Sequence, residues 1–316
     1  LPGTDIAEAQ RIVLGELPDL PHLPELPARG PGADLVGRGA GLLADLPVEL
    51  YAARWRLTAR PGRDLRLARD LMERDLDQLT AQADGYVGPL KVQAVGPWTL
   101  AAALELPRGG PALADPGAVR DLTGALAEGL RGHVAQVAAR VPGARPLLQL
   151  DEPGLSAVRD GRVPTASGLA TVRPVAADDL RAALARVVDE VRAPVVVHCC
   201  APRPPVALIA ASGAAAAAVD IDQEPDLDEL GAALDRGLGL FAGAAGTDPQ
   251  MPATAQAVAD RVERLWHVLG FAPALLPRQV VVTPACGLAG LGAGRARTLL
   301  AACRQAAGEV RDRVGG

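Results

Sequence analysis

Short apolar runs alternate with longer amphipathic stretches over most of this chain. Six runs rich in Val, Leu and Ala have the length of buried strands, and they occupy residues 90–95, 146–150, 194–198, 215–222, 239–245 and 279–283. Between and after them, apolar residues recur with helical spacing at residues 116–140, 177–192, 253–270 and 295–314. Continuous apolar strands joined by amphipathic helices are typical of a parallel sheet that is covered on both faces. The pattern therefore predicts an α/β fold.

The first 90 residues carry a weaker version of the same pattern. We expect helices at residues 4–15, 33–43 and 63–83, a short strand that begins at His22 or Leu23 and ends at Leu26, and a strand or hairpin arm at 49–58. Thr4 or Asp5 would cap the first helix. Residues 23–26 bring the predicted barrel strands to seven, and the eighth would precede Thr4. The sequence thus predicts a single domain over residues 1–316, a (β/α)₈ TIM-type barrel that lacks its first strand in this chain. A doubly wound open sheet is the alternative.

The composition limits what the protein could bind. Hydrophobic residues make up 49% of the 316 residues but aromatic ones only 2%, so the core is built from Ala, Leu and Val. The net charge is −5, and the basic residues form no stripe of the kind that binds nucleic acid. No apolar run approaches the roughly 20 residues of a membrane span, and no signal peptide is visible. We therefore expect a cytoplasmic protein with no nucleic-acid or membrane partner.

Residues with metal-binding chemistry lie at the ends of two predicted strands. His198, Cys199 and Cys200 end one run, and Cys286 follows the last run. In a barrel, catalytic groups occupy the carboxyl ends of the strands. Residues two apart in an extended chain point the same way, so His198 and Cys200 would face the barrel axis while Cys199 points into the wall. One imidazole and two thiolates are ligands that zinc favours, so we predict a zinc site here.

Carboxylates at two other strand ends extend this picture. Asp222 and Glu224 both lie at or beyond a strand end, and either could supply a fourth zinc ligand. Alternatively, they cap the helix that is expected to follow. Asp151 ends a third run, where it could bind a substrate ammonium group, cap a helix or pair with an arginine. The remaining histidines are expected to be structural: His22, His133 and His267.

Four short motifs resemble those of one enzyme family. Val197–Cys200 contains a His-x-Cys motif, and Thr283–Leu288 resembles Asn-Pro-Asp-Cys-Gly-Leu. Gln149–Pro153 resembles Gln-(apolar)-Asp-Glu-Pro, and Gly96–Thr99 resembles Gly-Pro-x-Thr. Any one motif is weak evidence, but together and in order along nearly the whole chain they are specific. The chain resembles the C-terminal barrel of cobalamin-independent methionine synthase.

The resemblance implies a zinc-dependent methyltransferase that transfers a methyl group to the thiol of homocysteine to form methionine. The zinc ligands would be His198, Cys200, Cys286 and Asp222, the last of them at the position of the family's ligand glutamate. Asp151 matches the carboxylate that binds the homocysteine amino group, and Glu25 matches a second homocysteine-binding glutamate.

Three positions depart from the family's pattern, and all belong to the folate half of its site. The family's catalytic histidine follows the seventh strand, where residues 240–245 contain none. Its folate-contacting tryptophan and glutamate fall at Ala103 and Ala157. The family's N-terminal half and its Ile-Gly-Ser motif would precede Leu1. Methyltetrahydrofolate needs a general acid at its leaving nitrogen, so we expect methylcobalamin or a methyl-corrinoid protein to be the better methyl donor.

Two alternatives belong to other functional classes. A zinc methyltransferase or lyase could act on another thiol, such as coenzyme M, and thiol-binding measurements would separate it from a homocysteine enzyme. A non-catalytic zinc-binding barrel would have a closed four-ligand site that no thiol perturbs.

Overall fold

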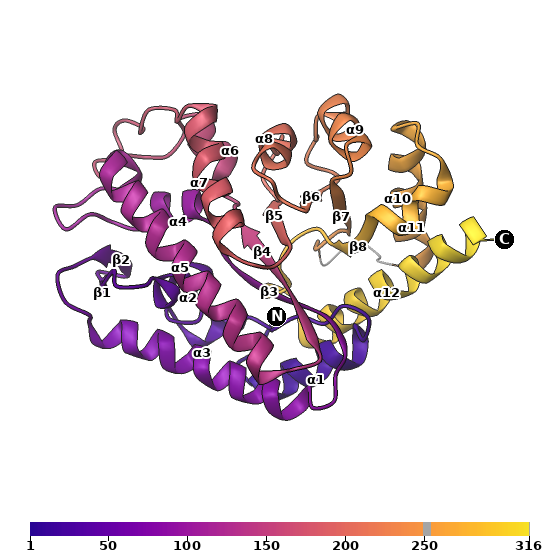
Figure 1. The fold of residues 1–316 in the computed structure, drawn as a ribbon, viewed down its shortest axis with the longest axis horizontal. Helices are drawn as coiled ribbons and strands as arrows, with labels where there is room; N and C mark the ends of the chain where they lie inside the picture. Colours follow the sequence, from indigo (N-terminus) through magenta and orange to yellow (C-terminus); the bar gives the residue numbers. More distant parts are fainter. Residues whose placement is uncertain (249–253, 316) are drawn as a thin grey trace.

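Six parallel strands form one curled sheet in a computed structural model that describes residues 1–248 and 254–315 (Figure 1). The strands are neighbours in chain order: β3 (Gly88–Val95), β4 (Ala144–Asp151), β5 (Val195–Cys199), β6 (Ala216–Asp220), β7 (Gly239–Ala245) and β8 (Val280–Pro284). Each coincides with a predicted run to within about two residues, which confirms the six strands. Because the strands are parallel, their carboxyl ends all lie at the same edge of the sheet.

Helices cover the outer face of the sheet with the predicted spacing (Figure 1). The longer ones are α1 (Ile6–Glu16), α3 (Arg63–Gln82), α5 (Pro116–Arg140), α7 (Ala177–Glu190), α10 (Ala255–Val268) and α12 (Ala293–Gly315). The shorter helices are α2 (Leu35–Leu42), α4 (Pro97–Ala103), α6 (Leu155–Arg159), α8 (Val206–Ala211), α9 (Leu227–Asp235) and α11 (Leu276–Gln279). The remaining elements are the hairpin β1 (Val48–Tyr51) and β2 (Arg54–Leu57) and the 3₁₀ turns η1 (Pro27–Arg29), η2 (Ala112–Ala114) and η3 (Pro273–Leu275). The start predicted for α10, residue 253, lies outside the described residues. No helix in the described ranges is both long and apolar enough to cross a membrane.

The strand predicted at 23–26 is reduced to a single parallel bridge between His22 and Lys91. The N–H of Leu23 donates to the Lys91 carbonyl (3.0 Å), and the N–H of Lys91 donates to the Pro21 carbonyl (2.9 Å). Proline has no N–H to donate, and prolines interrupt this ladder at short intervals: Pro21, Pro24 and Pro27. Among the described residues, no strand takes the place of the first barrel strand.

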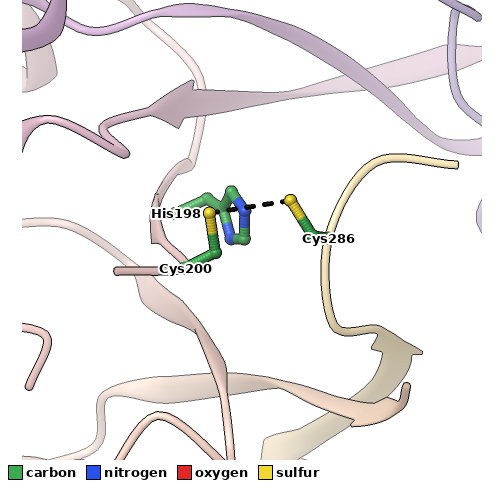
Figure 2. A group of neighbouring side chains, drawn as sticks. All are labelled: His198, Cys200 and Cys286. Carbon is green, nitrogen blue, oxygen red and sulfur yellow. Dashed lines mark hydrogen bonds between the residues drawn. The ribbon is translucent and has the colours of Figure 1, made fainter. Parts of the chain in front are cut away.

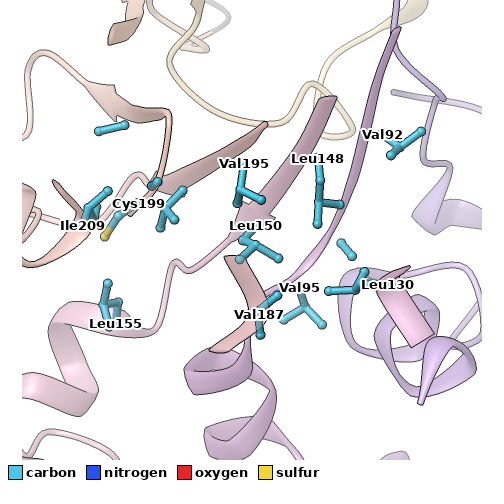
Figure 3. Close-up of a cluster of buried hydrophobic side chains, with 14 of the residues drawn as sticks. Val92, Val95, Leu130, Leu148, Leu150, Leu155, Val187, Val195, Cys199 and Ile209 are labelled. Carbon is cyan, nitrogen blue, oxygen red and sulfur yellow. The ribbon is translucent and has the colours of Figure 1, made fainter. Parts of the chain in front are cut away.

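The sheet divides the core into an outer and an inner layer. Outward side chains such as Leu148, Leu150 and Val195 pack against the surrounding helices (Figure 3). The inner face carries a small apolar cluster: Val196, Ala216, Ala218 and Phe241, with Leu20, Leu147 and Val281 packed against it. Alternate residues of a strand face opposite sides, so β5 turns Val195 outward and His198 inward. Polar side chains at the strand ends therefore gather above the inner cluster.

Candidate active site

Three of the predicted metal ligands meet at the carboxyl edge of the sheet. His198 lies on β5, Cys200 directly after it, and Cys286 just after β8 (Figure 2). Their donor atoms all lie within 4.8 Å of one another, and the two sulfurs are 3.6 Å apart. Cys199 belongs to the outer layer instead, fully buried with its sulfur 3.8 Å from the Ser156 hydroxyl. The two-residue period of the strand thus separates Cys199 from the cluster.

His198 is oriented by the neighbouring strand. Its Nδ1 atom lies 3.2 Å from the carbonyl oxygen of Ala218 on β6. A carbonyl oxygen can only accept a hydrogen bond, so Nδ1 carries a proton, and in the neutral ring Nε2 is then the nitrogen whose lone pair can bind a metal. Metal-binding histidines commonly use this arrangement, in which one ring nitrogen donates to a carbonyl and the other binds the ion.

The two cysteines of the cluster share one proton. A hydrogen bond of 3.6 Å joins the sulfurs of Cys200 and Cys286, and this bond, with a second between Cys286 and His198, lowers the pKa of Cys286 to about 4 despite burial. The same pairing, together with burial, raises the pKa of the Cys200 thiol. Burial lowers the pKa of His198, but the hydrogen bond with Cys286 and the charge of Asp151 outweigh it and raise that pKa above its usual value. The cluster therefore carries a thiolate, which attracts a cation.

The donor set of the cluster fits zinc. In proteins zinc takes imidazole nitrogen and thiolate sulfur in a tetrahedral array, with each sulfur about 2.3 Å from the metal. Two such sulfurs would lie roughly 3.8 Å apart. Because the sulfurs of Cys200 and Cys286 are 3.6 Å apart, they would need little movement to hold the ion together with His198.

The structure does not bring Asp222 to this cluster. Its carboxylate is exposed and forms an ion pair with Arg261, and Glu224 is exposed as well. Strand β6 ends at Asp220, so the alternation of faces does not extend to residue 222, and the geometry does not support Asp222 as the fourth ligand. Asp220 instead lies on the inner face, two residues beyond the partner of His198. The carboxylate of Asp220 accepts hydrogen bonds from the backbone N–H of Asp222 (3.0 Å) and from Nε2 of Gln223 (3.2 Å).

Asp151 lies beside the cluster of candidate metal ligands, at the end of β4. It is opposite His198 in the ladder between β4 and β5. Its Oδ1 accepts a hydrogen bond of 2.6 Å from Nε2 of Gln149. Burial raises the pKa of Asp151, while the positive charges of His198 and Lys91 oppose that rise. A carboxylate at this position can bind an ammonium group of a ligand whose other end contacts the cluster.

Glu25 comes to the same region from the loop before β3. Nε of Arg38 donates to Oε1 of Glu25 (3.0 Å), and Nη1 of Arg38 donates to Asp75 on α3 (2.8 Å). Arg29 donates twice to the same Asp75 carboxylate (2.6 and 2.7 Å). Burial raises the pKa of Glu25; Arg38 opposes this rise, and the negative charge of Asp151 adds to it. Glu25 and Asp151 are thus close enough to repel one another, which a shared cationic ligand would relieve.

Glu152, in the motif Gln149–Pro153, is hydrogen-bonded to the motif Gly96–Thr99, a contact that no local pattern in the sequence indicated. Its fully buried carboxylate accepts hydrogen bonds from the backbone N–H groups of Trp98 and Thr99 (2.9 and 2.7 Å) and from the Thr99 hydroxyl (2.6 Å). A Cβ added to Gly96 would lie 2.4 Å from Oε1 of Glu152, so only glycine fits there. Burial raises the pKa of Glu152 to about 7, although these hydrogen bonds oppose the rise. Glu152 therefore ties the loop after β3 to the end of β4, which carries Asp151.

The positions that the resemblance connects with folate binding carry apolar side chains. Residues 240–245 lie within β7 and contain no histidine, and Ala244 and Ala245 at its end are buried. Ala103 ends α4, and Ala157 lies in α6. None of these side chains can donate or move a proton.

Comparison with known proteins agrees with this arrangement. Residues 89–309 match a family model described as the catalytic domain of cobalamin-independent synthase. The solved structure of a B12-independent methionine synthase from Shewanella sp. W3-18-1, in complex with selenomethionine, aligns with a TM-score of 0.65 at 15% identity, over 98% of this chain and 88% of that one. A mandelate oxidase structure aligns with a TM-score of only 0.33 at 16% identity, over 99% of this chain and 94% of that one, which is too low a structural similarity to support a conclusion. No curated protein matches the sequence.

The structural match identifies the curled sheet as an α/β fold of the TIM-barrel type, as predicted. The family match covers more than half of the chain and includes the strands that carry Asp151, His198 and Cys286. This chain therefore belongs to the family defined by the catalytic domain of cobalamin-independent methionine synthase.

Proposed function

We propose that this protein is a zinc-dependent methyltransferase that transfers a methyl group to the thiol of homocysteine and forms methionine. The observation that carries the proposal is the convergence of His198, Cys200 and Cys286 next to Asp151 at one edge of the sheet. Family membership supports methyl transfer to homocysteine, and the donor set supports zinc as the metal.

The chemistry that zinc supplies is the activation of the thiol, because a thiol reacts as its thiolate and coordination lowers its pKa. The protein's own residues prepare that site. The Ala218 carbonyl holds the proton of His198 on Nδ1, which leaves Nε2 as the ligand atom. The sulfurs of Cys200 and Cys286 add negative charge, which keeps the substrate sulfur electron-rich.

Glu25 and Asp151 favour homocysteine over coenzyme M as the thiol. Homocysteine carries an ammonium group, which two neighbouring carboxylates attract. Coenzyme M carries a sulfonate and no ammonium group, so the same carboxylates would repel it. Buried charges interact more strongly than exposed ones, so this difference would be large at the site.

For the methyl donor, we propose methylcobalamin or a methyl-corrinoid protein in preference to methyltetrahydrofolate. Transfer from a tertiary amine requires a positioned acid to protonate the leaving nitrogen. Residues 240–245 offer no such acid. A methyl-corrinoid needs no proton on its leaving group, because the cobalt retains the electron pair of the broken bond.

Methionine formation by the zinc-loaded protein tests the proposal. Homocysteine would be supplied with methylcobalamin or with methyltetrahydrofolate, and zinc content would be measured in the same samples. We expect about one zinc per chain and faster turnover with methylcobalamin. Cys286→Ser should lose most of the metal and the activity, whereas Cys303→Ser, a buried cysteine on α12 outside the cluster, should keep both. Full zinc occupancy in Cys286→Ser, or no methionine from either donor, would contradict the proposal.

A further inference from the structure

Lys91 is the only lysine in the chain, and the fold brings it near both proposed substrate carboxylates. Its backbone pairs with His22, three residues before Glu25, and its strand pairs with β4, which ends at Asp151. It belongs to β3, where it pairs with Leu147, a residue of the inner face. Its side chain therefore points to the inside of the curled sheet. Burial lowers the pKa of Lys91, and the charges of Asp151 and Glu25 oppose this by stabilising the ammonium form.

The ammonium group of Lys91 has unused hydrogen-bonding capacity. Nζ offers three N–H groups. Within the described ranges it makes one side-chain hydrogen bond, to Oε1 of Gln93 at 3.3 Å, and no ion pair within 4.0 Å. A partly buried ammonium group with spare donors is costly unless a ligand or water satisfies it.

The neighbouring carboxylates have partners of their own. Glu25 accepts from Arg38, and Asp151 accepts from Gln149. Gln93, the hydrogen-bond partner of Lys91, lies opposite Gln149 in the ladder between β3 and β4. Lys91 is thus near both carboxylates without pairing directly with either. An α-amino acid presents an ammonium group and a carboxylate on the same carbon atom, which matches two carboxylates with a spare ammonium group near them.

We infer that Lys91 binds the α-carboxylate of the amino-acid substrate, while Glu25 and Asp151 bind its ammonium group. This inference rests on the proposed function, because it takes the substrate to be an amino acid with a thiol side chain. It adds a specificity determinant: the site would select thiols that carry both an amine and a carboxylate. The alternative role for Lys91 is to neutralise Glu25 and Asp151 without touching the substrate.

Three thiols separate these roles. Homocysteine carries both groups, 4-sulfanylbutanoate lacks the amine, and 3-aminopropane-1-thiol lacks the carboxylate. Calorimetric titration of the zinc-loaded protein would give the dissociation constant of each. Lys91→Met keeps most of the side-chain stem and removes the charge, so it should weaken binding of homocysteine and 4-sulfanylbutanoate by about 10- to 100-fold, the effect of losing a charge-assisted hydrogen bond. Binding of 3-aminopropane-1-thiol should stay nearly the same. Asp151→Asn should give the opposite pattern.

A second measurement uses the unaltered protein, so it does not depend on the folding of a variant. Because Lys91 is the only lysine, labelling with ¹⁵N-lysine gives a single Nζ resonance in NMR spectra. That resonance should shift on addition of homocysteine or 4-sulfanylbutanoate and shift much less with 3-aminopropane-1-thiol.

The outcomes are distinguishable. An equal loss of affinity for all three thiols in Lys91→Met, or an Nζ resonance that no bound thiol shifts, would overturn the inference and leave the proposed function standing. If 4-sulfanylbutanoate binds through Lys91 but homocysteine does not bind, the carboxylate site stands and the proposed substrate is wrong. If no thiol binds the zinc-loaded protein, both fail.

Discussion

Replacing Glu152 with Gln should remove a pH dependence of stability that the wild-type protein shows between about pH 4.5 and 7. The carboxyl group of Glu152 is fully buried, and burial raises its pKa from 4.5 to about 7. Between these values the folded protein retains a proton that the unfolded chain has lost. The stabilisation is therefore fully present below pH 4.5 and is lost as the pH rises through 7.

The size of the effect follows from the two pKa values. A difference of one pKa unit corresponds to about 1.36 kcal/mol, so a rise from 4.5 to about 7 corresponds to about 3 kcal/mol in the free energy of unfolding. Gln has no titrating group, so this contribution disappears in the variant. A constant loss of stability at every pH is also expected, because the amide accepts hydrogen bonds from Trp98 and Thr99 through one oxygen only.

Urea unfolding of both proteins at pH 5 and at pH 7.5 provides the assay. Glu25 and Asp151 also have raised pKa values, so the wild-type slope contains other contributions, and the difference between wild type and Glu152→Gln isolates Glu152. Glu128→Gln, a change at an exposed position on α5, is the control and should keep the wild-type pH dependence. Equal pH slopes in wild type and Glu152→Gln would refute the reasoning.

Two further substitutions test the site and its support. Gly96→Ala should lower the free energy of unfolding by about 1–3 kcal/mol in the same urea assay, because the new Cβ would lie 2.4 Å from Oε1 of Glu152. Gly132→Ala in α5 is the matched control, because nothing lies within 4 Å of its new Cβ. This control should leave the stability unchanged or raise it by up to about 1 kcal/mol. Asp222→Asn should leave zinc binding unchanged in competition with a chelator, because the Asp222 carboxylate is exposed and paired with Arg261; a loss of about 10-fold or more would restore Asp222 as the ligand.

The periodicity of the sequence predicted most of the fold, because the strands are buried on both faces and read as continuous apolar runs. The bounds of β7 and α5 coincide with the predicted ranges 239–245 and 116–140. The prediction was weakest at 23–26, where closely spaced prolines deprive the ladder of donors and leave one bridge at His22. The apolar character of this segment does not show how many of its residues can form backbone hydrogen bonds with β3.

The sequence likewise predicted some residues of the candidate site and not others. The alternation of faces along a strand placed His198 and Cys200 on one side, and the structure brings Cys286 to them. Asp222 could not be placed by that rule, because the strand ends at Asp220 and the backbone turns beyond it. A spacing taken from a resemblance holds only while the local conformation is the same.

Contacts between distant parts of the chain lay beyond any local pattern. The ion pair of Arg38 with Glu25 joins an arginine on α2 to the loop before β3, and Asp75 on α3 holds the same arginine. Similarly, Lys91 comes near Asp151 only because β3 and β4 are neighbours in the sheet. Such charged groups lie far apart in the sequence, and nothing in the residues near Lys91 indicates that a charged side chain lies close to it in the fold.

The most direct test of the central claim replaces zinc with cobalt(II) in the purified protein and follows its visible absorption as homocysteine is added. We expect about one cobalt ion to bind per chain through His198, Cys200 and Cys286, and we expect homocysteine to change the spectrum saturably as its sulfur binds the metal. A cobalt spectrum that stays constant while calorimetry shows homocysteine binding would contradict the claim that the substrate thiol is activated at this cluster.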